Sequence, residues 1–355
     1  MEQDRRLFIH CGLHKTGSTS VQRALPGLAG KLEDRGLYLP REFSKNRGAH
    51  HGLAYALKGP AVFRREGEKF QNMIAEMRGF QGNDFCISSE DFESYLARPR
   101  ALKRLLSICP EISVRPVFVI YLRNQIDYFE SLYLQLLRHG YSRSVTQTLD
   151  EIVATGLLTW RKWVFHFDYA AMAASLRATA PDPVLRNYHE LEGGSSISDF
   201  LTVLERPGLV APEKTELRAN QARVERNVRR FIVNRLGEEL APPAEELDTV
   251  IDGRRPRLSD AARRRFAERF GAGNAGIETD YGVRLNQYGP VQPPVAGTPV
   301  LDAIFEDDTT DAIAQLHNMA GTDNTGRDLR DRICENWFAG GAGKAEAAAR
   351  GAPVN

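Results

Sequence analysis

Short apolar runs alternate with amphipathic stretches along much of the chain. The apolar runs are typical of buried strands, and they predict strands at residues 6–11, 36–40, 85–90, 116–122 and 184–188. Apolar side chains at helical spacing predict helices at residues 18–28, 66–77, 99–108, 125–138, 159–178 and 196–205. Residues 41–62 show neither pattern and are expected to be irregular. Strands that alternate with helices predict an α/β fold with a mostly parallel central sheet.

The run PVFVIYL at residues 116–122 is the most apolar of these, and it predicts a central strand that is buried on both faces. In parallel sheets, ligands collect beyond the carboxyl ends of the strands. Three loops follow predicted strands in this way: the loop after Cys11, the region of Glu90 and the region of Arg123. We therefore expect a ligand site that draws on these three loops.

The C-terminal part of the chain differs in composition. Residues 219–240 are rich in arginine and predict a helix, and residues 258–270 predict another with Ser259 as its N-cap. Beyond residue 286, prolines and glycines cluster, and the final residues are low in complexity. We predict one domain over residues 1–285 and a partly disordered appendage over residues 286–355.

Composition excludes several classes of function. A net charge of +1 gives no general basic field, so no nucleic-acid partner is expected and an anion site must be local. No run of about 18 apolar residues is present, so no membrane span is expected. The cysteines show neither CxxC nor zinc spacing and predict reduced thiols in a cytoplasmic protein: Cys11, Cys86, Cys109 and Cys334.

The loop GLHKTGSTS joins the first predicted strand to the first predicted helix. In that position, main-chain amides at the helix N-terminus can bind a phosphate or a sulfate, and Gly12 and Gly17 let the backbone approach it. Lys15 precedes Gly17, whereas the lysine of the ATP-binding pattern GxxxxGK[ST] follows the second glycine. The loop thus predicts an anion site of another kind. The alternative is a plain strand–helix turn with an exposed lysine.

A second segment, YLRNQIDYFES, places Arg123 at the end of the central strand and Ser131 two turns into the next helix. A guanidinium and a hydroxyl in this arrangement can bind a second phosphate. The alternative is that Arg123 pairs with Asp127 or Glu130 on its own helix.

Together the two segments resemble the sulfotransferases that use 3′-phosphoadenosine-5′-phosphosulfate (PAPS). In that family a lysine precedes the glycine of the phosphosulfate loop, and an arginine after a strand is followed by a serine at the 3′-phosphate. Further stretches are similar to the bacterial branch related to carbohydrate sulfotransferases, among them GLYLP, ISSEDF, RNYHEL, ISDFL and FAERFGAGNAGIETDYG. The resemblance covers roughly residues 5–285.

The resemblance implies a P-loop NTPase-like three-layer fold, with helices flanking the sheet, and transfer of the sulfuryl group from PAPS to a hydroxyl of a saccharide or glycolipid. Lys15 would stabilise the leaving phosphate oxygen. No metal is implied, because a sulfuryl group carries less negative charge than a phosphoryl group. The residues that the resemblance places on PAPS are Lys15, Thr16, Gly17, Ser18, Thr19, Ser20, Arg123 and Ser131.

Two features depart from the cytosolic small-molecule enzymes of the family. Those enzymes carry a tryptophan at the position of Ser20, and they have a late Arg-Lys-Gly loop that this sequence lacks. The segment 217–220 is a candidate replacement for that loop.

The acceptor hydroxyl requires a general base within hydrogen-bond reach. Glu90 and His51 are the first candidates, and His50 and His14 are further ones. Glu90 can instead be a carboxylate at a helix start, and the histidine pair can be solvated. Side chains that can line a glycan cleft are Tyr95, Tyr133, Gln135, Trp160 and Trp163. The two tryptophans are predicted on one helix and are expected in the core rather than in a cleft.

Two other functions compete with the sulfotransferase. A nucleotide kinase or another phosphate-loop NTPase needs a lysine in the GK[ST] position and an acidic residue for magnesium. A non-catalytic relative would bind nucleotide or glycan through a degenerate site. It is disfavoured because the loop lysine, its hydroxyl neighbours and the Arg123–Ser131 pair are all present.

Overall fold

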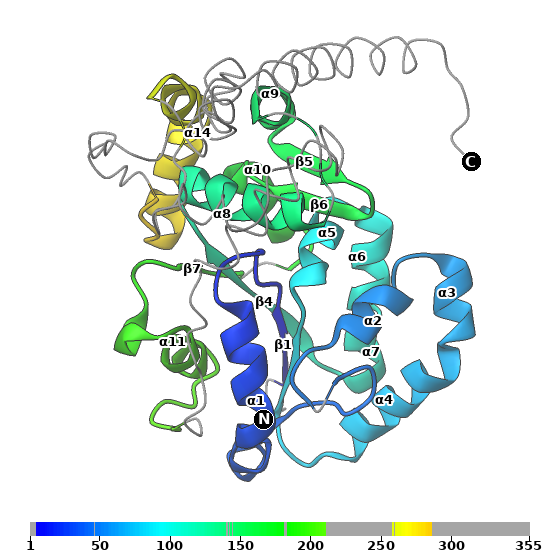
Figure 1. Ribbon diagram of the computed structural model, residues 1–355. Helices are drawn as coiled ribbons and strands as arrows, with labels where there is room; N and C mark the ends of the chain where they lie inside the picture. Colours follow the sequence, from blue (N-terminus) through cyan, green and yellow to red (C-terminus); the bar gives the residue numbers. More distant parts are fainter. Residues whose placement is uncertain are drawn as a thin grey trace, which may run out of the picture. The chain divides into compact units, whose positions relative to one another are not determined.

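The computed structural model describes residues 5–45, 47–139, 141, 143, 145–180, 183–210, 258 and 260–285 (Figure 1). The chain divides into two compact units. The first, here called the sheet unit, contains residues 1–125, 152–216 and 267–288. The second unit contains residues 126–151, 217–266 and 289–355.

The sheet unit is built on five parallel strands in the order β2-β3-β1-β4-β7. Their bounds are β1 Arg6–His10, β2 Leu37–Tyr38, β3 Asp84–Ser88, β4 Arg115–Leu122 and β7 Val184–Asn187. In the central register, Ile9 of β1 lies opposite Ile87 of β3 and Phe118 of β4. The predicted α/β class and parallel central sheet are confirmed.

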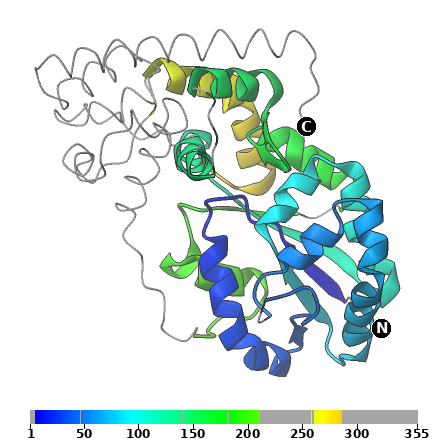
Figure 2. The same cartoon turned by 45° about the vertical axis from the view of Figure 1, so that its right-hand side comes forward.

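Helices cover both faces of this sheet. Figures 1 and 2 show α1 (Ser18–Asp34) and α11 (Ser196–Val203) on one side of β1 and β4, with α2 (His51–Ala56) and α6 (Pro99–Leu106) on the other. On the first side, Leu25 of α1 and Phe200 of α11 join a buried apolar cluster with strand side chains. Further helices of this unit are α3 Pro60–Arg65, α4 Gly67–Gly79, η1 Glu90–Phe92, α5 Glu93–Leu96, α7 Ile108–Ile112, α10 Tyr169–Arg177, η2 Glu192–Gly194 and the later part of α14 (Asp260–Tyr281).

The helix predicted over residues 159–178 is wrong in its first half. An antiparallel hairpin, β5 (Leu157–Trp160) and β6 (Trp163–His166), occupies this stretch. Arg161 adopts φ 53° in the turn, and Asp168 caps α10 by accepting a hydrogen bond from the Ala171 amide at 3.0 Å. The helix therefore begins only after this cap. The prediction of an irregular segment at 41–62 is also wrong in part, because α2 lies within it and α3 begins in it at Pro60.

The second unit contains most of α8 (Gln125–Arg138) and most of α9 (Val145–Thr155). It also contains the first part of α14 (Asp260–Tyr281). Within it, Glu130 accepts hydrogen bonds from the Leu258 amide at 2.7 Å and from Arg263 at 3.1 Å. The ring centroids of Phe129 and Phe266 lie 5.9 Å apart. These contacts tie α8 to the start of α14.

Several predictions fall outside the described residues. They concern the helix at 219–240, the segment 217–220, the N-cap Ser259, Cys334 and the appendage at 286–355. In the part of the chain that the structure describes, no helix is both long enough and apolar enough to cross a membrane.

Candidate anion site and acceptor pocket

Four loops meet at the carboxyl edge of the sheet. Beyond the strands themselves, main-chain hydrogen bonds continue from Cys11 N to Val119 O at 3.0 Å, from Ser89 N to His10 O at 3.1 Å and from Tyr188 N to Leu122 O at 2.8 Å. Because the strands are parallel, the loops after β1, β3, β4 and β7 all emerge at this edge. The structure thus brings together the three loops that the sequence singled out and adds the loop after β7.

The loop after β1 turns sharply through two left-handed residues. Lys15 has φ 66° and Gly17 has φ 82°. The Thr16 hydroxyl donates to the Leu13 carbonyl at 2.6 Å, so this buried side chain stabilises the turn. Gly17 is the N-cap of α1 and supplies no side-chain cap. The first amides of the helix are therefore directed at the space where an anion can bind, beside the exposed Lys15.

Gly12 is required by close packing inside this loop. A Cβ at this position would lie 2.0 Å from Ser18 Oγ and 3.0 Å from His10 Nε2. Both of those atoms are buried and lack a hydrogen-bond partner among the described residues. Burial lowers the pKa of His10 to about 3, so its imidazole is neutral at physiological pH. A buried hydroxyl at a helix N-terminus fits a phosphate oxygen, because the hydroxyl can donate to it.

Arg123 lies directly beside the loop. Its Nη1 donates to the Lys15 carbonyl oxygen at 3.3 Å, and its guanidinium lies 5.7 Å from the ring centroid of Tyr188. The Tyr188 ring also borders Gly17, where a Cβ would lie 3.0 Å from Cε2. The Tyr169 hydroxyl donates to the Arg123 carbonyl at 2.8 Å and holds the start of this loop.

The other predicted nucleotide contacts are distributed as follows. Thr19 is exposed and Ser20 is partly exposed, both in the first turn of α1. Ser131 is partly exposed on α8 and belongs to the second unit, so its predicted role at a 3′-phosphate stays a prediction.

His14 is anchored by Glu93 behind the loop. Glu93 Oε2 accepts a hydrogen bond from the His14 amide at 3.1 Å and lies 2.8 Å from His14 Nδ1. Its other oxygen accepts the His166 amide at 2.9 Å. Burial opposes the charged form of His14, but the hydrogen bond and charge of Glu93 outweigh it and raise the His14 pKa. His14, which the sequence offered as a base, is thus a buried anchor of the loop.

His51 and Glu90 lie together, as candidates for one chemical step should. His51 Nε2 is 3.8 Å from Glu90 Oε2, and Nδ1 is 2.9 Å from Ser89 Oγ and 3.4 Å from Asp91 Oδ2. The hydrogen bond with Asp91 raises the pKa of His51 against partial burial, with help from the charge of Glu90. Glu90 in turn accepts a hydrogen bond from Gln22 of α1 at 2.7 Å.

His50 has a structural role instead. Its side chain is fully buried, its Nδ1 accepts the Ser88 amide at 3.2 Å, and its Nε2 lies 3.1 Å from the Pro40 carbonyl. Burial lowers its pKa to about 4. Both nitrogens are engaged, so His50 cannot receive a proton from an acceptor.

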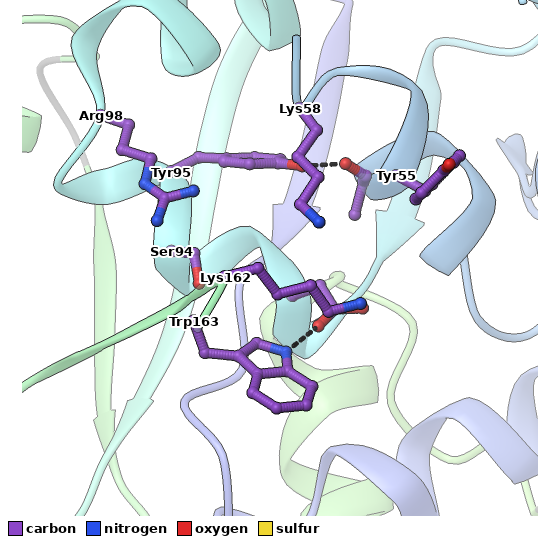
Figure 3. Close-up of a pocket in the computed structure, with 9 residues that line it drawn as sticks. Tyr55, Lys58, Ser94, Tyr95, Arg98, Lys162 and Trp163 are labelled. Carbon is purple, nitrogen blue, oxygen red and sulfur yellow. Dashed lines mark hydrogen bonds between the residues drawn. The ribbon is translucent and has the colours of Figure 1, made fainter. Parts of the chain in front are cut away.

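A small pocket that opens to solvent includes Asp91 of the His51 cluster in its lining. Figure 3 shows Tyr95, Trp163, Lys58, Arg98 and Lys162 around it. Trp163 Nε1 donates to Asp91 Oδ1 at 3.1 Å, and the Tyr95 hydroxyl donates to the Ala54 carbonyl. The lining residues are Ala54, Tyr55, Lys58, Asp91, Ser94, Tyr95, Arg98, Lys162 and Trp163. Asp91 belongs to both the pocket and the His51 cluster, so the two features form one site.

Among the aromatic residues proposed for a cleft, Tyr95 and Trp163 line this pocket. The expectation that the tryptophans belong to the core is wrong for Trp163, which is half-buried and borders the pocket. Trp160 stacks on it with ring centroids 5.4 Å apart. Tyr133 and Gln135 lie on α8 in the second unit.

Sequence reasoning missed three residues of this site: Asp91, Glu93 and Tyr188. Asp91 and Glu93 stand in the same SSEDFES stretch as Glu90, where a row of acids resembles an ordinary helix start. Tyr188 stands in the RNYHEL stretch, immediately after a predicted strand. Its position at a strand end was the available signal.

No protein-family model matches this chain, and no curated protein or solved structure is significantly similar to it. Within the described ranges, no group of three or more His, Cys, Asp or Glu side chains is placed to hold a metal ion.

Proposed function

We propose that this chain is a PAPS-dependent sulfotransferase that transfers a sulfuryl group to a hydroxyl of a saccharide or glycolipid. The observation that carries the proposal is the 3.3 Å contact between Arg123 Nη1 and the Lys15 carbonyl. It puts a guanidinium beside a loop of helix amides, hydroxyls and an ammonium group. Two adjacent anion-binding elements suit a nucleotide with a phosphate at each end of its ribose.

The residues present fit such a nucleotide. The buried Ser18 hydroxyl and the first amides of α1 can hold the 5′-phosphate, with Thr19 at the rim. Arg123 can hold the 3′-phosphate, and the Tyr188 ring offers an aromatic face next to it. Parallel strands with a phosphate-type loop after β1 support a P-loop NTPase-like fold. The buried free thiols of Cys11, Cys86 and Cys109 suit a cytoplasmic protein.

When bound, PAPS supplies an activated sulfuryl group: the acceptor oxygen forms a bond to sulfur as the bond from sulfur to the 5′-phosphate oxygen breaks. Lys15 stabilises the negative charge that develops on the phosphate oxygen, and the loop amides hold the group in line for attack. The proton of the acceptor hydroxyl passes to a base. No residue of the chain becomes covalently modified.

The His51 cluster supplies that base. We assign the proton transfer to His51, because Asp91 lies 3.4 Å from Nδ1 and orients the ring, and the hydrogen bond with Asp91 raises the pKa of the imidazole that would accept the proton. Glu90, 3.8 Å from His51 Nε2, then stabilises the imidazolium that forms. The alternative assignment, with Glu90 as the base and His51 as its partner, uses the same two side chains.

Calorimetry of the full chain with adenosine 3′,5′-bisphosphate and with ATP–magnesium tests the proposal. We expect the bisphosphate to bind more tightly, because the loop lacks the lysine position of ATP-binding loops. Tighter binding of ATP–magnesium would favour a kinase or NTPase. Bisphosphate binding without sulfuryl transfer to any saccharide would indicate a non-catalytic relative.

A further inference from the structure

Three cationic side chains surround the pocket beside the His51 cluster. Lys58 follows α2, Arg98 precedes α6, and Lys162 stands in the β5–β6 turn, so three separate segments deliver positive charge to one place (Figure 3). Within the described ranges, none of the three forms an ion pair with a carboxylate. Positive charge that converges on one pocket from three segments indicates an anion-binding site rather than an ordinary solvated surface.

The acidic residue of the lining does not balance this charge. The carboxylate of Asp91 is shared by Trp163 Nε1 at 3.1 Å and His51 Nδ1 at 3.4 Å. Partial burial and the charges of Lys162 and Arg98 lower the pKa of Lys58, and the opposing attraction of Asp91 does not cancel this shift. The cations therefore repel one another in the free protein, and an anion between them would relieve that repulsion.

Aromatic rings form the other part of the lining. Lys162 Nζ lies 5.2 Å from the Trp163 ring centroid, and Lys58 Nζ lies 5.8 Å from that of Tyr55. Tyr55 is 51% exposed, although large apolar side chains are usually covered. The rings thus add apolar surface to the lining next to the ammonium groups, a combination that suits a sugar with a charged substituent.

We propose that this pocket binds an anionic substituent, a carboxylate or a sulfate, and that the acceptor is accordingly an acidic saccharide. The identity of the ligand as an acceptor rests on the proposed function, whereas the preference for an anion rests on the pocket alone. Because Asp91 joins the pocket to His51, a saccharide whose acidic ring occupies the pocket has its neighbouring ring beside the base.

Calorimetry of the full chain without nucleotide tests the preference. The probes are a disaccharide with one glucuronate and the same disaccharide with glucose in its place. We expect the acidic probe to bind about 10- to 100-fold more tightly, as for charge-assisted hydrogen bonds. The double variant Arg98→Gln/Lys162→Gln should lose this preference and keep the affinity for the neutral probe. A sulfated disaccharide distinguishes a sulfate from a carboxylate as the preferred group.

Lys103→Gln is the matched control, because Lys103 is exposed on α6 and does not line the pocket. It should retain the preference of the wild type. Equal affinities for the two probes, no binding of either, or an unchanged preference in the double variant would each overturn the inference. Binding of adenosine 3′,5′-bisphosphate to the double variant should stay at the wild-type level. Failure of the wild type to bind that nucleotide would instead count against the proposed function.

Discussion

Glu93 contacts His14 twice: one carboxylate oxygen accepts the His14 amide at 3.1 Å and lies 2.8 Å from the ring Nδ1. The carboxylate is fully buried, and its second oxygen accepts the His166 amide at 2.9 Å. One side chain therefore joins the loop after β1 to the β5–β6 hairpin. The residue next to His14 is Lys15, so Glu93 determines the backbone position from which the proposed catalytic lysine starts.

Glu93→Gln should destabilise the protein by about 1–3 kcal/mol, because it removes a charged acceptor from buried donors. The raised pKa of His14 adds stability that is fully present below pH 6.5 and is lost as the pH rises through the folded-state pKa. The difference from wild type should thus be larger at pH 6 than at pH 8.5. Urea unfolding measures it, with the exposed Glu111→Gln as control. If the loss of stability in Glu93→Gln instead grows with pH, the pair of Glu93 with a charged His14 does not stabilise the fold.

Lys15→Ala should reduce sulfuryl transfer by about 10²–10³-fold or more, because it removes a preorganised charge from the leaving oxygen. Unfolding should be unaffected, since Lys15 is exposed. Steady-state kinetics with PAPS measures the loss, and Lys31→Ala, exposed at the other end of α1, is the control. Near-normal turnover would show that the role is misassigned.

Arg123→Ala should weaken the binding of adenosine 3′,5′-bisphosphate by roughly 2–3 kcal/mol, as for a lost charge-assisted contact. Adenosine 5′-phosphate, which lacks the 3′-phosphate, should bind both forms alike. Calorimetry provides both values, and Arg23→Ala, exposed on α1, serves for comparison. An unchanged dissociation constant would leave Arg123 with a structural role only.

The pH profile of kcat/KM should distinguish His51 from Glu90. If His51 is the base, it must lose its proton, so activity should rise with pH through an apparent pKa above 6.5. Asp91→Asn should move this limb to lower pH, because the Asp91 hydrogen bond is the main cause of the raised pKa. His51→Gln should lose about 10²–10⁴ in rate. If kcat/KM is instead constant from pH 6 to 8 and Glu90→Gln abolishes activity, Glu90 is the general base.

His50→Gln should make the protein less sensitive to acid. His50 has a folded-state pKa of about 4, so the stability that its neutral form contributes to the folded protein is fully present above pH 6.5 and is lost as the pH falls toward 4. Between these values the wild type should lose about 1.4 kcal/mol per pH unit for each such histidine. In urea unfolding, the free energy of unfolding of the variant should fall less steeply with decreasing pH, by the equivalent of about one bound proton. The variant should nevertheless be less stable than the wild type at pH 7. An identical slope would mean that His50 does not titrate in this way.

The sheet could be predicted from sequence because its strands are covered on both faces. The run in β4 is apolar at every position after Arg115, and the centre of β1 is the apolar run Leu7, Phe8 and Ile9, so no surface pattern competes with that signal. The hairpin at β5 and β6 was missed because LLTWRKWVFH also places apolar residues at helical spacing. Only the left-handed Arg161 and the cap at Asp168 decide against a helix there.

The site could be predicted in its parts but not in its connections. Lys15 stands in the loop after β1 and Arg123 directly follows β4, which the sequence indicates, but their contact depends on β1 and β4 being neighbours in register. Glu93 could not be distinguished from the acids beside it, because its role depends on burial against His14. The same limit applies to the pocket, which brings together Lys58, Arg98 and Lys162 from three distant segments.

The central place of β1 also bears on how the chain is made. β1 is synthesised before both of its neighbours in the sheet, which begin at Asp84 and Arg115. The N-terminal segment therefore emerges from the ribosome long before its partners do, and pairing between such distant segments is slow. Until those partners follow, its apolar residues have no sheet neighbours and are exposed to misassembly.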